Sequence, residues 1–511
     1  MRHPSPDCSV ETVNGVIFQK FPAAYVLLRF TWALLLLSST GLLAFSVYRA
    51  ATFPFTHDES LSFAIFSWEP MWNATANNHL LNTLLMRCCS ALFGNSELSL
   101  RLPNVLAHAI YLTCTLLLLK RFQHAVLQMA GFVMLNLNPY LLDFFFLARG
   151  YGLALAFLML SLYLLTRAYE EKRQQGFANY LYMSVLAGSL AVLANFSFLN
   201  YYLPLLLASA WLLLSDVSLR RLSRSHISAT IALFAASGIF LAVVLFKILK
   251  LRWSGELYFG GHNGFMSDTV GSVVRCSLYS AIYSHTTVKV ISAILLCLFI
   301  VILLLGLGLF FLRREVPLFA LFLLILTSAV ALPPLQHRLF HTLFPAGRAG
   351  LYYLPMYAVG LLSTLDWLAR LSSRRWEILV VLLLPVTIAA VLSWHFYRSF
   401  NTHVCYNWAF DGHNKEILKL INRDRERNFP GRIVNLGNSW LLEPSLNFYR
   451  VTRNYTWLAP VTRMPISDTK NDYIYEFMSE VKDIPVDHHI LLAYYPDTHT
   501  ILLRVAHAHG P

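Results

Sequence analysis

The sequence has few charged residues for its length. Only 13% of its 511 residues are Asp, Glu, Lys or Arg, whereas 57% are hydrophobic and the mean hydropathy is +0.53. A soluble chain of this size does not need so much apolar surface, and long apolar runs are typical of membrane spans. The composition therefore argues against a soluble enzyme and favours a polytopic membrane protein.

Paired cysteines, repeats and a cleavable leader are also lacking. The seven cysteines form no C-x-x-C pair, so neither a zinc site nor a disulfide framework is predicted. The chain contains no internal repeat and no low-complexity segment. Its first 20 residues are polar and mixed, without the pattern of a signal peptide, so we expect the first apolar run to remain as a span.

The apolar runs predict an α-helical polytopic membrane protein. A span needs about 20 apolar residues. The sequence offers about eleven such runs: residues 25–48, 102–119, 124–142, 150–168, 179–196, 199–216, 227–249, 288–312, 316–333, 350–369 and 376–396.

The net charge of +13 comes from short basic clusters between the apolar runs rather than from one basic face, which disfavours nucleic-acid binding. With the N-terminus in the cytoplasm, every cluster falls in a cytoplasmic loop, as the positive-inside rule requires. The clusters are Lys120 and Arg121; Arg167, Lys172 and Arg173; Arg220, Arg221 and Arg224; Arg313 and Arg314; and Arg370, Arg374 and Arg375. The sequence therefore predicts a cytoplasmic segment 1–24 and an extracytoplasmic C-terminal domain.

Three regions follow from this topology: the segment 1–24, a transmembrane domain 25–398 with outside loops 49–101 and 250–287, and an extracytoplasmic α/β domain 399–511. In the first outside loop, His79–Met86 is expected to form a short amphipathic helix at the membrane interface. In the C-terminal domain the pattern predicts one helix and four strands. The helix is Asn414–Arg427, and the strands are Arg432–Leu436, Tyr473–Phe477, Ile490–Tyr495 and Thr500–Val505.

Two adjacent carboxylates and a histidine directly follow the first apolar run, in His57-Asp58-Glu59. Charged groups so close to hydrocarbon are costly, and they usually serve a function or lie in a water-filled cavity. The alternative is a solvated loop in which Thr56 caps a helix that carries the acids in its first turn.

A second polar pair borders an apolar, aromatic turn, with Asp143 on one side and Arg149 on the other. Both residues are expected on the same face of the membrane as Asp58. The alternative to a functional role is a salt bridge between Asp143 and Arg149 that closes the turn, because charges at membrane depth tend to pair.

Four stretches together resemble the GT-C class of polytopic glycosyltransferases, especially the bacterial relatives of protein O-mannosyltransferases and of the lipid A aminoarabinose transferase. The resemblance covers roughly residues 25–370, and the C-terminal domain adds nothing specific to it. The four stretches are His57-Asp58-Glu59; Asn78-His79-Leu80-Leu81-Asn82 with Glu97–Pro103; Ala148-Arg149-Gly150-Tyr151-Gly152; and Gly347-Arg348-Ala349-Gly350-Leu351-Tyr352.

The resemblance implies transfer of a sugar from a polyprenyl-phosphate donor to a glycan, lipid or protein acceptor, with inversion, at the outer face of the bacterial inner (plasma) membrane. It places the general base on Asp58, with Glu59 as its partner and Asp143 as a second acid. The aromatic surroundings of Asp143 and the histidine before the acid pair depart from the pattern expected of the family.

The substrate-binding candidates lie in the same stretches. Arg149 and Arg348 stand at the outside ends of two expected spans, where a lipid phosphate would lie, and a guanidinium suits a phosphate better than an ammonium does. Arg348 could instead be an interfacial anchor. The other candidates are His57, His79, Asn82, Tyr151 and Tyr352.

No cofactor is predicted with certainty, and a divalent metal stays an open candidate. His337 and His341 stand four residues apart and would share a face of a helix, but no acid lies near them.

Two other classes of function fit parts of the pattern. A transporter or lipid flippase should show charged or broken segments at mid-membrane depth and related halves. Here the acids gather at one face, and no repeat is present. A non-catalytic scaffold of the same fold would have no need of the acid pair, which this sequence has.

Overall fold

The structure is a computed structural model that describes residues 22–68, 75–171, 176–214, 224–279, 283–312, 317–464, 466, 470–480 and 489–506. Most of the expected segment 1–24, and the basic residues Lys172, Arg173, Arg220, Arg221, Arg313 and Arg314, lie outside this part of the chain.

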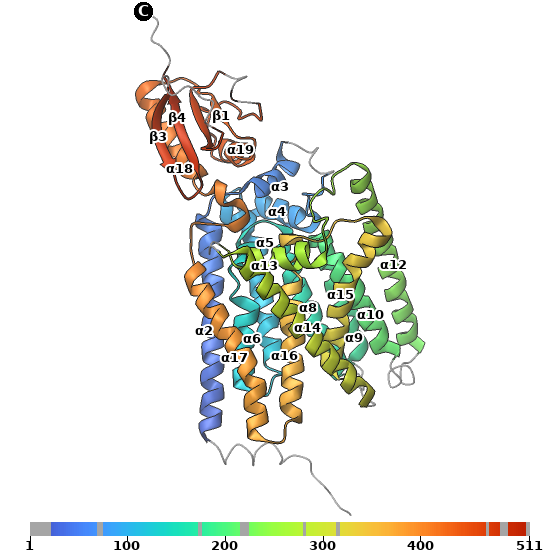
Figure 1. Ribbon diagram of the computed structural model, residues 1–511. Coiled ribbons are helices and arrows are strands. Elements are labelled where there is room, and N and C mark those ends of the chain that lie inside the picture. The colour runs from blue at the N-terminus through green and yellow to red at the C-terminus, as the bar shows by residue number, and fades with distance from the viewer. Residues whose placement is uncertain are drawn as a thin grey trace, which may run out of the picture.

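A bundle of long helices forms most of the molecule, and a small domain with a four-stranded sheet stands at one end of it (Figure 1). The helices of the bundle and its loops are α2 (Pro22–Thr52), α3 (His57–Ser67), α4 (Leu80–Phe93), α5 (Glu97–Leu119), α6 (Ala125–Asn136), α7 (Pro139–Phe146), α8 (Gly150–Glu170), α9 (Phe177–Ala194), η2 (Phe196–Phe198), α10 (Leu199–Leu214), α12 (Arg224–Trp253), η3 (Phe265–Val270), α13 (Gly271–Ser277), α14 (His285–Leu312), α15 (Leu318–Phe340), η4 (Gly347–Gly350), α16 (Tyr353–Leu371) and α17 (Arg375–Ser399). The C-terminal domain contains η5 (Tyr406–Asp411), α18 (Asn414–Asn428), β1 (Leu436–Asn438), α19 (Glu443–Thr452), β2 (Tyr473–Phe477), β3 (His489–Tyr495) and β4 (Thr500–Val505).

The predicted fold class is confirmed: the chain is an α-helical, multi-pass membrane protein with a small C-terminal α/β domain. Within the described residues, nine helices are long and apolar enough to cross a membrane, or ten if the bent pair α6–α7 counts as one span. The remaining expected span, 350–369, is present as α16, which is long enough but is not among the helices apolar enough to cross a membrane.

The expected third span, 124–142, is broken in two. α6 ends at Asn136 and α7 begins at Pro139, and their axes differ by 62°. The cause is local, because proline lacks the N–H that would continue a helix and favours the first turn of a new one. Asn138 caps that new helix by accepting from the backbone N–H groups of Tyr140 and Leu141.

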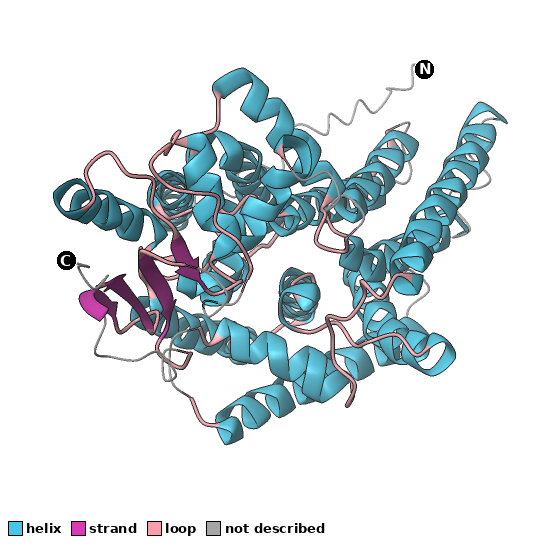
Figure 2. Cartoon of the chain, turned by 90° about the horizontal axis from the view of Figure 1, so that it is seen from above, coloured by secondary structure: helices cyan, strands magenta, loops and turns pink. Residues whose placement is uncertain are grey.

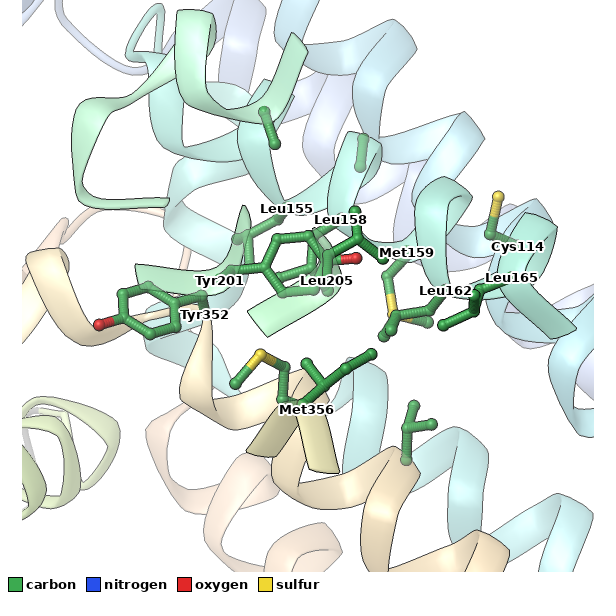
Figure 3. Close-up of a cluster of buried hydrophobic side chains, with 14 of the residues drawn as sticks. Cys114, Leu155, Leu158, Met159, Leu162, Leu165, Tyr201, Leu205, Tyr352 and Met356 are labelled. Atoms are coloured by element: carbon green, nitrogen blue, oxygen red, sulfur yellow. The ribbon is translucent and has the colours of Figure 1, made fainter. Parts of the chain in front are cut away.

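The apolar core lies around α8, which packs against α5 and α9. Of the most apolar stretch of α8, 78% is buried, against 11% for α12 and 17% for α14, whose side chains are therefore free to face lipid. Figure 3 shows part of this core, where Met159 and Leu162 of α8 meet Tyr201 of α10 and Met356 of α16.

Glycines at the start of α8 let it pack closely. A Cβ at Gly150 would lie 1.9 Å from the carbonyl oxygen of Ala194, and one at Gly152 would lie 2.3 Å from that of Phe144. The residue just before α8, Arg149, is thereby held deep between neighbouring helices.

The C-terminal sheet has the strand order β1-β2-β4-β3, with β1 parallel to β2 and the other neighbours antiparallel. Seen from above, its strands lie over one side of the bundle (Figure 2). The domain shares a hydrophobic cluster with the bundle loops, in which Phe55 and Phe63 pack against Phe448. α3 is therefore covered by protein and does not lie free at a lipid interface.

Two of the basic clusters meet at the opposite end of the bundle. Arg121, after α5, pairs with Glu170 of α8, and the Arg370 guanidinium of α16 donates to the Arg121 carbonyl over 2.8 Å. The site described below and the C-terminal domain both lie at the other end (Figure 1).

Candidate active site

Glu59 is locked into the scaffold of the site. Its carboxylate lies 2.6 Å from the Arg101 guanidinium, and both side chains have no exposed surface. It also accepts from the backbone N–H groups of Ala148, over 2.5 Å, and of Thr56, over 2.9 Å. The expected cap at Thr56 is present, and Glu59 completes it as a capping box. Glu59 is thus held by the scaffold with no exposed surface, and its part in catalysis stays a prediction.

Arg101 continues this scaffold. Its guanidinium also donates to the carbonyl groups of Ala50, Phe53 and Pro54. One buried ion pair therefore joins the end of α2, the start of α3, α5 and the turn before α8. This framework fixes the position of Asp58, which lies between His57 and Glu59.

Asp58 lies between two arginines. One of its carboxylate oxygens is 3.3 Å from a guanidinium nitrogen of Arg149 and 3.1 Å from one of Arg348. The other oxygen accepts from the Asn77 amide over 3.3 Å. Residues from α3, from the start of α8 and from η4 thus meet at one carboxylate, although they are up to 290 positions apart in the sequence.

The electrostatics of the site keep this carboxylate ionised. Burial acts to raise the pKa of Asp58, but the guanidinium of Arg149, and then that of Arg348, outweigh it and hold the pKa below its ordinary range. An ionised carboxylate is the form that can accept a proton from a substrate.

Arg149 directs both terminal nitrogens of its guanidinium to protein groups, and its buried Nε has no hydrogen-bond partner. Its guanidinium donates to the Asp58 carbonyl, the Ser62 hydroxyl and both the carbonyl and the side chain of Asn77. Only 1% of its side chain is exposed. The structure therefore brings Arg149 to Asp58 as predicted, but in a place where it orients the acid.

Arg348 is the more open of the two arginines, with 22% of its side chain exposed. It lies 5.0 Å from the ring centre of Phe259 and 5.1 Å from that of Trp408, in cation–π contact with both. A guanidinium that keeps unused donors near the surface can bind a phosphate without dismantling the scaffold.

His79 and Tyr151 line the buried side of the site. Their rings meet edge to face at 5.1 Å. Burial, and then the charges of Arg149 and Arg348, lower the pKa of His79 well below its ordinary value, so the imidazole is neutral. Its Nε2 atom is buried and has no hydrogen-bond partner.

Asn82 is satisfied by the protein. Its amide donates to the Ala148 carbonyl and accepts from Asn104, each over 2.8 Å. It thereby holds the turn that carries Arg149, which is a supporting role next to the site.

Asp143 is not brought to Asp58. Its carboxylate lies 2.7 Å from the Arg49 guanidinium and accepts from the Tyr279 hydroxyl and the backbone N–H of Tyr406. The alternative salt bridge between Asp143 and Arg149 does not form either, because each residue has another partner. Arg49 comes from α2, 94 residues earlier, so sequence spacing gave no sign of this pairing.

His57 and Tyr352 also point elsewhere. The His57 imidazole donates to the Leu441 carbonyl over 2.7 Å and meets Trp440 edge to face, so it faces the C-terminal domain. Tyr352 is fully buried next to Phe198 and Tyr353 and belongs to the apolar core (Figure 3).

The histidines considered for a metal have other environments. His337 donates to the Thr342 carbonyl over 2.7 Å and stacks on Phe344, and His341 ends α15 in a left-handed conformation. The part of the chain that the structure describes contains no group of three or more His, Cys, Asp or Glu residues placed to hold a metal ion.

Several residues of the site had no assigned role at the level of sequence. Arg101 stands in a stretch that resembles the family, so a signal for it was present. Asn77, Phe259 and Trp408 carried no signal, because only the folded chain brings them to Asp58 or Arg348.

The comparisons with known proteins agree with the resemblance seen in the sequence. The family model described as dolichyl-phosphate-mannose-protein mannosyltransferase matches residues 78–245, roughly a third of the chain, including His79, Arg149 and Tyr151. This match confirms the resemblance to the GT-C glycosyltransferases. No curated protein matches the sequence.

Two solved structures are similar along most of the chain. The crystal structure of ArnT from Cupriavidus metallidurans bound to undecaprenyl phosphate aligns with a TM-score of 0.47 at 11% identity, covering 92% of this chain and 97% of that one. The structure of the same protein in the apo state aligns with a TM-score of 0.41 at 11% identity, covering 93% and 98%.

Proposed function

We propose that the chain is a membrane glycosyltransferase that moves a sugar from a polyprenyl-phosphate donor to an acceptor hydroxyl on the extracytoplasmic face, with inversion at the anomeric carbon. The observation that carries the proposal is the Asp58 carboxylate held between Arg149 and the more open Arg348. The matched family, whose name describes transfer from a lipid-phosphate sugar, supports the same reaction class.

In the proposed reaction, Asp58 takes the proton of the acceptor hydroxyl as its oxygen attacks the anomeric carbon. The bond from that carbon to the phosphate oxygen breaks, and the polyprenyl phosphate leaves with the bonding electrons. General-base assistance of this kind contributes about 10²–10⁴-fold in rate. A single displacement at the anomeric carbon inverts its configuration.

Arg348 has the leaving-group role in this proposal. A phosphate is doubly suited to compete with Asp58 for the guanidinium, because it offers more oxygens and more charge. When the donor binds, Arg348 turns part of its hydrogen bonding from Asp58 to the phosphate. This exchange stabilises the leaving group and frees a lone pair of Asp58 for the acceptor.

The proposed orientation places the N-terminus in the cytoplasm and the site at the outer face of the bacterial inner membrane. The meeting of the clusters around Arg121 and Arg370 at the end remote from Asp58 supports it, because basic residues mark the cytoplasmic side.

The test is a transfer assay with purified protein in lipid nanodiscs and a panel of undecaprenyl-phosphate-linked sugars. We expect acceptor-dependent release of undecaprenyl phosphate and a glycosylated product of inverted anomeric configuration. As a counter-test, the protein is placed in sealed vesicles with the same donors, and movement of the donors across the bilayer is measured. Movement of intact donor across the bilayer without release of lipid phosphate would contradict the proposal and favour a flippase.

A further inference from the structure

The C-terminal domain forms hydrogen bonds with the backbone just before Asp58. The N–H of Phe55 donates to the Tyr449 hydroxyl over 2.7 Å, and the Ser445 hydroxyl donates to the Phe55 carbonyl over 2.5 Å. Two residues later, the N–H of His57 donates to the Asp411 carboxylate over 2.7 Å. These contacts join positions more than 350 residues apart in the sequence.

Asp411 is built into a closed network. It is fully buried, and its second oxygen accepts from the Asn414 amide over 2.8 Å. The same amide nitrogen donates to Ser445 over 2.8 Å, which returns the network to Phe55. Side chains from η5 and α19, linked by Asn414 of α18, therefore hold two of the three residues that precede Asp58.

The contact from Asp411 falls at a position that a helix leaves open. His57 is the first residue of α3, and the first four N–H groups of a helix have no partner within it. Asp411 thus fixes where the first turn of α3 begins, and Asp58 is the next residue in that turn.

We propose that Asp411 is a positioning residue for Asp58: the C-terminal domain sets the first turn of α3, and through it the direction of the Asp58 carboxylate. This inference rests on the proposed function of Asp58. A displacement of about 1 Å at a reacting group costs up to roughly 10²-fold in rate. Without the C-terminal domain, the helix bundle would still hold the Asp58 side chain through Arg149 and Arg348. The contact from Asp411 that fixes the backbone before Asp58 would be missing.

The test uses matched variants of the full chain. Asp411→Ala removes the acceptor of the His57 N–H. Asp411→Asn keeps a side-chain oxygen for that N–H. Its new amide nitrogen takes the place of the oxygen that accepts from Asn414, so the Asn414 amide must turn over and present its own oxygen, which has no partner in this structure. The control is Asp424→Ala, which breaks a contact with Arg504 and Tyr473 inside the same domain without touching α3.

Hydrogen exchange measured by mass spectrometry reads the position of α3 without any substrate. Exchange of the amides of residues 57–60 should rise in Asp411→Ala and stay near wild type in Asp411→Asn and Asp424→Ala. Unchanged exchange in Asp411→Ala, or an equal rise in Asp424→Ala, would overturn the inference. If Asp411→Ala does not fold, Asp411→Ser replaces it, because serine keeps a polar group in the network but cannot span the distance to His57.

Steady-state kinetics give the second readout, with the donor that wild-type protein consumes. We expect Asp411→Ala to lower kcat by about 10–10²-fold with KM nearly unchanged, and Asp411→Asn to restore most of the rate. Equal kcat values for Asp411→Ala and Asp424→Ala would overturn the positioning role. Failure of the proposed function appears differently, as wild-type protein that releases no lipid phosphate or as an Asp58→Asn variant with an unchanged rate.

Discussion

Asp58 differs from the other two acids predicted for the site in how much of its side chain remains open. About 10% of the Asp58 side chain is exposed, against none for Glu59 and 2% for Asp143. Glu59 and Asp143 pair only with buried arginines, which compensates the cost of a buried charge, whereas Asp58 also pairs with the partly exposed Arg348. Of the three, Asp58 is therefore the acid that a substrate can reach.

Replacement of Arg348 by lysine tests the leaving-group role. Lysine keeps the charge but loses the planar fork that binds two phosphate oxygens at once. We expect undecaprenyl phosphate to bind Arg348→Lys roughly tenfold more weakly, a cost of about 1.4 kcal/mol. Binding can be measured by native mass spectrometry. Arg338→Lys, at an exposed end of α15, is the control, and equal binding by both variants would make Arg348 an interfacial anchor.

Replacement of Glu59 by glutamine should act on stability first. It leaves the Arg101 guanidinium buried without its counter-charge, and breaking a buried pair in this way costs about 3–5 kcal/mol. We expect a large fall in the thermal unfolding temperature of purified Glu59→Gln. The exposed acid Glu416 serves as control, and a Glu416→Gln variant should unfold like wild type. An unfolding temperature of Glu59→Gln within a degree of wild type would refute the scaffold role.

At the scale of elements, β2 carries a buried acid, Glu476, through which the stability of the fold depends on pH. Burial is the main cause, with a smaller contribution from nearby Glu480, and together they raise the pKa of Glu476 to about 8. A raised pKa means that the folded state prefers the protonated acid. Its favourable contribution is complete below the ordinary pKa of a glutamate and is lost as the pH rises through about 8.

The variant Glu476→Gln removes this loss. Glutamine stays neutral at every pH and can still accept from the backbone N–H of Phe477. The raised pKa lies several units above the ordinary value, and one pKa unit corresponds to about 1.4 kcal/mol. We therefore expect little stabilisation at pH 5 and a gain of a few kcal/mol at pH 9. Thermal unfolding of the variant and of wild type at pH 5 and pH 9 measures this gain. A stability difference between the two proteins that is the same at both pH values would contradict the burial argument.

Elements with a strong local pattern were predictable from the sequence. The strands Tyr473–Phe477 and Thr500–Val505 appear with the expected bounds, and the helix predicted at Asn414–Arg427 ends one residue later. The expected strand Arg432–Leu436 is shifted, because β1 begins only at Leu436. α19 was missed: its run Glu443–Thr452 is short, and its burial depends on contacts with the bundle.

The site was only partly predictable for a physical reason. Asp58, Arg149 and Arg348 carry charge next to apolar runs, so a functional or paired role could be expected from the cost of burial alone. The partner of each charged residue could not be predicted from the sequence. Asp143 pairs with Arg49, and Glu59 with Arg101, because of how distant helices pack. The cover that the C-terminal domain places on α3 is likewise a property of the folded chain.

For the whole molecule, the orientation across the membrane is the first prediction to test. With native Cys88 and Cys89 replaced by serine, we expect an Ile433→Cys variant to react with an impermeant thiol reagent in intact cells, because Ile433 is exposed in the C-terminal domain. Ser373→Cys, between α16 and α17, should react only after lysis. The reverse pattern would place the site in the cytoplasm.

The central claim is that Asp58 is the base of a sugar transfer, and the variant Asp58→Asn tests it most directly. Asparagine keeps the shape and accepts hydrogen bonds from both arginines, but it cannot take a proton. Transfer rate, undecaprenyl phosphate binding and unfolding temperature should be measured on one preparation. We predict folded protein that still binds the lipid and transfers at least about 10²-fold more slowly. Near-normal transfer by folded Asp58→Asn would contradict the account.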